Sequence, residues 1–382
     1  MNGEDDAVKL NWKHWLSYIL KPYLNHLTIY YTSLRLTYQH FLRIYPKLHV
    51  YTPTTSRVQK ETRSTMDFCD KICPCFTSRS DNSENSLPIK NKRVEKGKFS
   101  DNFHYVSAAA QGWRPSMEDR YANMLNIENN VSFYGVFDGH AGSHTAQMLS
   151  EHLFHVIIEN EDFSNKEYIS SLIKGFVNMD NRLSTDSRVH IDISGSTGIV
   201  IMIDEEDNIH SSWLGDSRAV ISHNGIAQNL TYDHLPTNPE EYLRIKRANM
   251  FVSNDRVNGS LAMSRAFGDF IFKQHEGLSP ENQAVSCRPD VYRRKVDYAK
   301  DEFIVLGSDG LWEMLDGQQV VDFVRSRLAS NSDCRNLSST LEATVMDLID
   351  MAVTDDIMNE EGVGCDNITA TLRRAFVCTQ YF

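Results

Sequence analysis

The 382-residue sequence has no apolar stretch of about 18 residues, the length that a membrane-spanning helix needs. Its amino terminus begins with Glu4, Asp5 and Asp6 rather than a basic segment and an apolar core, so we expect no secretory signal. Cysteine is scarce, with seven residues, and a secreted disulfide scaffold would be shorter and richer in it. These absences predict an intracellular, cytoplasmic protein, with nuclear or peripheral membrane residence left open.

Basic charge is also in deficit, with 39 Lys and Arg against 51 Asp and Glu and a formal net charge of −12. This balance argues against a nucleic-acid partner, because such binding depends on basic surface. The charge is uneven: residues 1–65 carry nine basic and four acidic side chains, net +5, which leaves −17 to residues 66–382. The basic head and the acidic body are therefore predicted to be separate parts.

Residues 1–65 are predicted to form a basic amphipathic extension. Within 7–50, Trp12, Trp15 and Ile19 fall on one helical stripe, interrupted by Lys and Arg. A stripe of this kind fits docking on the body or on a partner, peripheral membrane association, or disorder. The residues alone leave these three interpretations open.

A polar segment over residues 66–102, rich in Ser, Asn and Lys, indicates a linker. It contains a cysteine cluster at Cys69, Cys73 and Cys75. Acylation of these thiols is one interpretation. Zinc binding is a weaker one, because the C-x₃-C-x-C spacing has no fourth ligand nearby.

Residues 103–377 show one pattern of short apolar runs and helix-like segments throughout, which predicts a single catalytic domain. Short apolar runs of strand type occupy 131–137, 197–203, 209–214, 218–222, 303–307 and 368–372. Helical periodicity marks 144–158, 167–183, 239–248, 318–328 and 338–353. The strands come in hairpin-like groups and the helices in pairs, which favours an α+β architecture with antiparallel sheets over a regular βαβ repeat.

Carboxylates stand where several of these apolar runs end or begin. They are Glu118, Asp119, Asp138, Asp216, Asp309 and Asp366. One Asp beside Gly usually serves a turn, but several carboxylates that converge would repel one another unless cations neutralise them. No Cys or His pair at metal spacing accompanies them, so this oxygen-only set predicts hard divalent cations such as Mg or Mn.

Two such ions about 3.5–4 Å apart activate a water and clamp an oxyanion, which suits the hydrolysis of phosphate esters. That reaction also needs a cationic group for the phosphate oxygens, and the planar fork of Arg114 fits this role. It needs an acid for the leaving oxygen, and His140 follows Asp138 by two positions. The residues alone predict a two-metal hydrolase.

Seven ordered motifs narrow this prediction. They are Gln111-Gly-Trp-Arg-x-x-Met-Glu-Asp119, Phe137-Asp-Gly-His-Ala-Gly142, Ser194-Gly-Ser-Thr197, Leu214-Gly-Asp-Ser-Arg218, Asp255-Arg-Val-Asn-Gly-Ser-Leu-Ala-x-Ser-Arg-Ala-Phe-Gly-Asp269, Ser308-Asp-Gly-Leu-Trp312 and Cys365-Asp-Asn367. In this order, across roughly 105–375, the chain resembles the metal-dependent type 2C serine/threonine protein phosphatases. The resemblance does not extend to residues 1–100. It implies two packed antiparallel β-sheets flanked by helices, an α/β/β/α sandwich, and hydrolysis of phosphoserine and phosphothreonine by direct attack of a water bridging two divalent ions.

The resemblance also implies metal ligands. Asp138 resembles the carboxylate that bridges both ions, and Gly139 would offer its carbonyl oxygen to one of them. Asp309 and Asp366 resemble ligands of the other ion, while Glu118 would act mainly through water. Two further acidic residues have weaker roles by resemblance: Asp119 as a water-mediated neighbour, and Asp216 as a residue that helps bind a possible third ion.

By the same resemblance Arg114 binds phosphate and His140 is the general acid. The chain departs from the family pattern at Glu313, where Asp is usual, at Leu235, where Lys is usual, and at Ala248-Asn-Met250, which replaces Gly-Gly before the flap loop. None of these changes removes a central ligand. We therefore predict an active, monomeric enzyme acting on phosphoproteins; the alternative is a catalytically weak pseudophosphatase that binds phosphoproteins or acts as a scaffold.

Overall fold

The computed structural model describes residues 87–100, 103–127, 130–186, 188, 193–330, 337–355 and 363–374. All of these lie in the second of two compact units, Asp67–Phe382. The predictions for the extension 1–65 and for the cysteine cluster fall outside the described residues. Within the described ranges, no helix combines the length and apolarity needed to cross a membrane.

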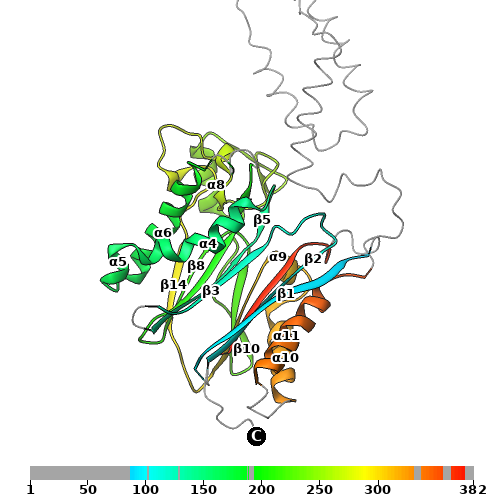
Figure 1. Ribbon diagram of the computed structural model, residues 1–382. Coiled ribbons are helices and arrows are strands. Elements are labelled where there is room, and N and C mark those ends of the chain that lie inside the picture. The colour runs from blue at the N-terminus through cyan, green and yellow to red at the C-terminus, as the bar shows by residue number, and fades with distance from the viewer. Residues whose placement is uncertain are drawn as a thin grey trace, which may run out of the picture. The chain divides into compact units, whose positions relative to one another are not determined.

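Two antiparallel sheets form the centre of this unit (Figure 1). The first has the order β1 (Ile89–Ser100), β2 (Phe103–Gly112), β16 (Ile368–Arg374), β15 (Asp301–Gly307), β9 (Arg218–His223), β10 (Ile226–Asn229). The second has the order β14 (Asp290–Lys295), β8 (Asn208–Leu214), β7 (Gly198–Ile203), β4 (Val131–Phe137), β3 (Arg120–Ile127). The predicted α+β fold with packed antiparallel sheets is confirmed.

The two sheets pack face to face through alternate residues of their central strands. On β7, Ile199 and Ile201 join the apolar cluster between the sheets, whereas Val200 and Met202 join the cluster beneath the helices. Ile304 of β15 enters the same inter-sheet cluster from the other side. Successive side chains of a strand point to opposite faces, so a strand buried on both faces is apolar throughout. This explains why the central strands were readable as continuous apolar runs.

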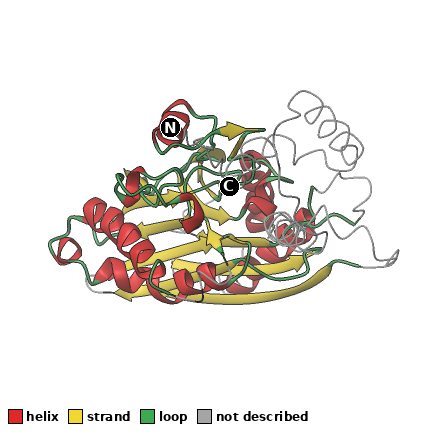
Figure 2. Cartoon of the chain, turned by 90° about the horizontal axis from the view of Figure 1, so that it is seen from above, coloured by secondary structure: helices red, strands yellow, loops and turns green. Residues whose placement is uncertain are grey.

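Helices cover the outer face of each sheet. Helices α4 (His144–Ile158) and α6 (Tyr168–Leu183) pack on the second sheet, with the short α5 (Glu161–Ser164) between them. Helices α10 (Gly317–Ala329) and α11 (Leu337–Ala352) pack on the first. In Figure 2, seen from above, these helices appear red beside the yellow strands. Each large side chain that they bury fully contributes about 1.5–3 kcal/mol.

A smaller flap unit lies between β10 and β14 in the sequence. It contains α8 (Pro239–Arg247), the hairpin β11 (Val252–Ser253) and β12 (Arg256–Val257), and the 3₁₀ turns η4 (Phe270–Phe272) and η5 (Pro280–Asn282). Its own apolar cluster includes Ala248, with Met250 packed against it. The two residues that depart from the Gly-Gly pattern therefore fill space in the flap core.

The linker prediction for 66–102 is wrong over residues 89–100, which form β1 and pair with β2. Lys92 and Lys96 of β1 form ion pairs with Asp350 and Glu342 of α11, each at 2.5 Å. The lysine charges that suggested a solvated linker are thus paired with acidic residues of α11, a helix far away in the sequence. The folded domain begins before Phe103.

Candidate active site

Three candidate ligands meet where strands of both sheets end. Asp138 follows β4, Asp309 opens the short helix α9 (Asp309–Trp312) after β15, and Asp366 precedes β16. Strands β15 and β16 are antiparallel neighbours, so the end of one lies beside the start of the other. A Cβ on Gly310 would lie 2.2 Å from the carbonyl oxygen of Asn367, which shows how closely these two turns approach.

The carboxylates act strongly on one another. Burial raises the pKa of Asp138 well above its usual range, and the charges of Asp309 and Asp119 raise it further. Burial and the charge of Asp366 raise the pKa of Asp119 to about 7, although Thr369 donates a hydrogen bond to it at 2.8 Å. The predicted convergence of these residues is therefore present in the structure.

Asp366 also carries a cationic partner. Burial and the charge of Asp309 raise its pKa to about 6, while Arg114 opposes that rise. The Arg114 guanidinium lies 2.5 Å from the Asp366 carboxylate, so the predicted phosphate-binding residue faces the cluster. The Asn367 side chain holds this loop by donating to the carbonyl oxygens of Gln111 and Ser116, at 2.8 and 3.0 Å.

Glu118 lies on the same loop and is fixed from two sides. Ser116 Oγ donates to one carboxylate oxygen at 2.9 Å, and the Gly142 amide donates to the other at 3.2 Å. The carboxylate is thus oriented by its loop and by the turn after β5 (Gly139–His140). Gly139 itself cannot be replaced without movement, since a Cβ there would lie 2.5 Å from the carbonyl oxygen of Glu118.

Asp216 belongs to the turn between β8 and β9. Burial raises its pKa to about 7, together with the charges of Asp309 and Asp233. The preceding Gly215 adopts φ +90°, and its amide donates to His234 Nδ1 at 3.1 Å. The structure therefore places Asp216 within electrostatic range of the central cluster, as predicted.

The chemistry of this donor set fits divalent hard cations. Among the described residues, Oδ1 of Asp216 and Oδ1 of Asp309 are buried without a hydrogen-bond partner. Buried, mutually repelling carboxylates with unpaired oxygens are the arrangement that bound cations would relieve. In these ranges no three His, Cys, Asp or Glu side chains already form a ready ligand group. This does not conflict with an ion such as Mg²⁺, which binds through only one or two carboxylates and retains several waters.

His140 has a partner that the sequence analysis did not identify. Its Nε2 lies 2.8 Å from Oδ2 of Asp269, the last residue of the long motif that begins at Asp255. Burial would lower the pKa of His140, but the charge and hydrogen bond of Asp269 outweigh burial and raise it. Motif membership was the only sequence signal for Asp269.

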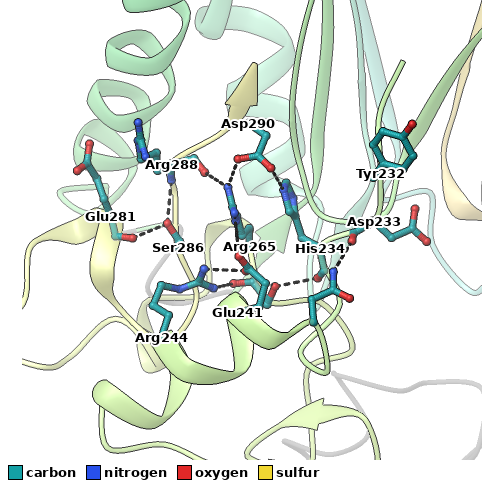
Figure 3. A network of polar contacts seen from close by, with 12 residues as sticks. Tyr232, Asp233, His234, Glu241, Arg244, Arg265, Glu281, Ser286, Arg288 and Asp290 are labelled. Carbon is teal, nitrogen blue, oxygen red and sulfur yellow. Dashed lines mark hydrogen bonds and ion pairs between the residues drawn. The ribbon is translucent and has the colours of Figure 1, made fainter. Parts of the chain in front are cut away.

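A second polar network joins the flap to the Asp216 turn (Figure 3). Glu241 of α8 binds Arg244 at 2.7 Å and Arg265 at 2.8 Å. Arg265 also forms an ion pair with Asp290 at 2.7 Å, and Asp290 lies 3.2 Å from His234 Nε2. Burial would raise the pKa of Glu241, but the two arginines lower it to about 2. None of these roles was predicted from the sequence.

Two departures from the family pattern lie at the surface. Leu235, next to His234, is 40% exposed. Glu313 is also exposed and closes helix α9. Neither residue replaces one of the clustered carboxylates.

Comparison with known proteins identifies one family. The model of the protein phosphatase 2C family matches residues 103–357. The chain is 38% identical over 274 residues to protein phosphatase 2C homolog 2 of Schizosaccharomyces pombe, covering 70% of this chain and 71% of that protein. It is 38% identical over 267 residues to protein phosphatase 2C homolog 2 of Saccharomyces cerevisiae, covering 68% of this chain but only 56% of that protein. A phosphatase structure from Toxoplasma gondii is similar with a TM-score of 0.62 and 26% identity, covering 75% of this chain and 96% of that one.

Proposed function

The chain belongs to the protein phosphatase 2C family of metal-dependent serine/threonine protein phosphatases, and from this premise we propose that the carboxylate cluster hydrolyses phosphoserine and phosphothreonine in protein substrates. The observation that carries the proposal is the convergence of Asp119, Asp138, Asp309 and Asp366, each acting on the charge of another. A turn residue has no need of such neighbours.

The proposed ligand assignment is the one that the family resemblance implies. Asp138 would contact both ions, and the Gly139 carbonyl oxygen would be a further ligand of one of them. Asp309 and Asp366 would hold the second ion, with Glu118 contributing through water. Two Mg²⁺ or Mn²⁺ ions bound there would lower the pKa of a water and stabilise the charge that develops on the phosphate.

Two acidic residues complete the proposed set. Asp119 is 3% exposed and would orient water rather than bind an ion directly. Asp216 would help bind a third, weaker ion, because its buried Oδ1 has no hydrogen-bond partner among the described residues.

The remaining chemistry belongs to two side chains. Arg114 would hold phosphate oxygens, since it already lies at the edge of the cluster and its planar fork suits bidentate contacts. His140 would protonate the departing serine or threonine oxygen, because an alkoxide is a poor leaving group without a proton. The substrate is therefore a phosphoprotein whose phosphorylated side chain reaches this cluster.

An Asp309→Asn variant tests the assignment. We expect it to lose Mn²⁺-dependent turnover of a phosphoserine peptide and to bind Mn²⁺ more weakly by calorimetry, with an unchanged circular dichroism spectrum. Asp322→Asn, a change of the same kind at an exposed position of α10, is the control and should retain both properties. Full turnover by a folded Asp309→Asn enzyme would refute the metal site.

A further inference from the structure

The partner of His140 reaches it across a three-stranded sheet. This sheet has the order β13 (Phe267–Gly268), β6 (Gly195–Ser196), β5, with Gly268 opposite Gly195 and Gly195 opposite His140. Asp269 directly follows β13, so it and His140 come from the two outer strands. Their side chains meet over the middle strand, with 2.8 Å between His140 Nε2 and Asp269 Oδ2.

Gly195 makes this contact possible. A Cβ on Gly195 would lie 2.3 Å from Asp269 Oδ2 and 2.3 Å from His140 Nε2, directly in the path of their hydrogen bond. The backbone of Gly195 does not have a positive φ, so its conformation does not itself require glycine. Because Gly195 has no side chain, the Asp269 carboxylate and the His140 ring can come within hydrogen-bond distance of each other.

Asp269 is held in an uncommon conformation for this contact. It has φ +52°, is 5% exposed, and precedes η4 without capping it through its side chain. A left-handed conformation is unfavourable for most residues with a side chain, although Asp tolerates it better than most. The carboxylate is thus used for His140 instead of for its own turn.

A buried ion pair fixes the segment that carries Asp269. Asp180 of α6 accepts a hydrogen bond from the Gly268 amide at 2.8 Å. Lys273 donates to both Asp180 oxygens, at 2.9 and 2.8 Å, and to the Ala266 carbonyl oxygen at 2.9 Å. The Lys273 and Asp180 side chains are only 4% and 3% exposed. Burying two charges is expensive, so such a pair is better explained by the geometry it imposes than by net stability.

The tautomer of His140 follows from these contacts. An ionised carboxylate only accepts hydrogen bonds, so Nε2 carries a proton and donates the hydrogen bond that Asp269 accepts. The other ring nitrogen, Nδ1, is buried and has no hydrogen-bond partner among the described residues. His140 lies two residues after Asp138, and the Gly142 amide two residues further on donates to Glu118 at 3.2 Å, so this residue stands beside the cluster.

We propose that Asp269 is a positioning residue that holds the His140 ring through Nε2, so that Nδ1 is the atom that delivers the proton to the leaving oxygen. This inference rests on the proposed function of His140. Before the step the ring is an imidazolium with a proton on each nitrogen. When the bond between phosphorus and the serine oxygen breaks, its electron pair stays on that oxygen and takes the proton from Nδ1, while the other ring proton stays on Nε2. Water supplies the new oxygen on phosphorus and loses a proton to solvent, and the ring is left neutral with its proton on Nε2. A positioning carboxylate of this kind fixes both tautomer and orientation.

The test compares two leaving groups in the full-length, Mn²⁺-loaded enzyme. Asp269→Asn should lower kcat on a phosphoserine peptide by about 10²-fold, the lower range for a general acid, with little change in KM. On p-nitrophenyl phosphate it should change kcat by less than a few fold, because nitrophenolate leaves without a proton. Gly195→Ala should show the same selectivity, because its methyl group separates the two side chains.

Asp204→Asn is the matched control, since Asp204 Oδ2 lies 2.9 Å from His210 Nε2 in a buried pair elsewhere in the fold. Any loss of folded protein in this variant should reduce both activities by the same factor. If Asp269→Asn lost the same factor of activity on both substrates, Asp269 would have only a structural role, like Asp204, and the proposal would be overturned.

A second measurement does not depend on activity. In metal-free protein with ¹⁵N-labelled histidine, the His140 ring signal, identified by its loss in His140→Gln, should report a proton on Nε2. This signal should change in Asp269→Asn and stay constant in Asp204→Asn; an unchanged signal in Asp269→Asn overturns the inference.

The outcomes separate two failures. If the wild type does not cleave the peptide, or if His140→Gln loses no more activity on the peptide than on p-nitrophenyl phosphate, the proposed function fails and the inference fails with it. If His140→Gln is selectively impaired while Asp269→Asn behaves as wild type, only the role of Asp269 is refuted.

Discussion

Replacing Glu241 with Gln should destabilise the flap unit in a pH-dependent manner. Glu241 is 3% exposed and lies between the guanidinium groups of Arg244 and Arg265, with Ser264 Oγ also donating to it at 2.5 Å. Gln has nearly the same shape but no charge. The substitution therefore leaves two largely buried arginines without their shared counter-ion, which is the costly way to break a buried ion pair.

The magnitude follows from the pKa of Glu241, which falls from 4.5 to about 2 in the folded protein. A shift of that size corresponds to about 3 kcal/mol of folding free energy at neutral pH. A carboxylate with a depressed folded pKa contributes its stability above the unfolded pKa and loses it as the pH falls toward the folded pKa. The contribution is thus complete above about pH 5 and gone below about pH 2.

The assay is urea unfolding of metal-free protein at pH 7 and pH 4. At pH 7 we expect Glu241→Gln to lower the free energy of unfolding by about 3 kcal/mol. At pH 4 the difference from wild type should shrink by roughly 1 kcal/mol, because the unfolded wild-type chain then binds protons at this position and the folded one does not.

The control is Glu240→Gln on the same turn of α8, where the side chain is exposed and should change stability by less than about 0.5 kcal/mol. Two results would refute the reasoning. One is a Glu241→Gln variant as stable as the control at pH 7. The other is a difference from wild type that stays constant between the two pH values.

Two further predictions concern the carboxylate cluster and the buried pair behind it. Because the pKa values of Asp119 and Asp216 are raised to about 7, the metal-free fold loses stability as the pH rises toward and through 7, so Mn²⁺ should raise the thermal midpoint more at pH 8 than at pH 5. At 100 times its dissociation constant the ion would add about 2.7 kcal/mol; equal shifts at both pH values in thermal scans would contradict the electrostatic explanation. Asp180→Asn, which leaves Lys273 buried without a counter-charge, should cost about 3–5 kcal/mol in urea unfolding. Asp347→Asn removes an exposed partner of Arg327 and should cost less than about 1 kcal/mol, so similar losses in both variants would be inconsistent with a buried charge at Lys273.

The central elements of the fold were predictable because their patterns are local. The strand predicted over 131–137 is β4 and the helix predicted over 144–158 is α4, with the same bounds. Strands at the sheet edges were not predicted. Strand β1 is rich in Lys, and β14 reads Asp-Val-Tyr-Arg-Arg-Lys, with most of its residues exposed and none fully buried. An edge strand needs little apolar surface, so its identity comes from the neighbour it pairs with.

The candidate site divides in the same way. Four of the carboxylates were found because each stands beside Gly or Asn where an apolar run ends or begins. Glu118 and Asp119 have no such neighbour and were found in the motif that also contains Arg114. Asp269 was not found, because its partner His140 is 129 positions away and only the pairing of β5, β6 and β13 brings them together. Glu241 was missed for the same reason, since its charge resembles that of an exposed helix residue until Arg265 is placed beside it.

The structure assigns different tasks to the charged residues at the site and to those behind it. The residues behind are fully bonded: Asn367 holds the Glu118 loop, Asp180 holds the Asp269 segment, and His234 holds the amide before Asp216. In contrast, buried carboxylate oxygens of Asp216 and Asp309 have no hydrogen-bond partner among the described residues, at a cost in stability. A backbone held in this way cannot relax to relieve that repulsion, so the carboxylates stay arranged for cations. The bonded residues behind the site are therefore the reason why a cluster that opposes folding can persist in the folded chain.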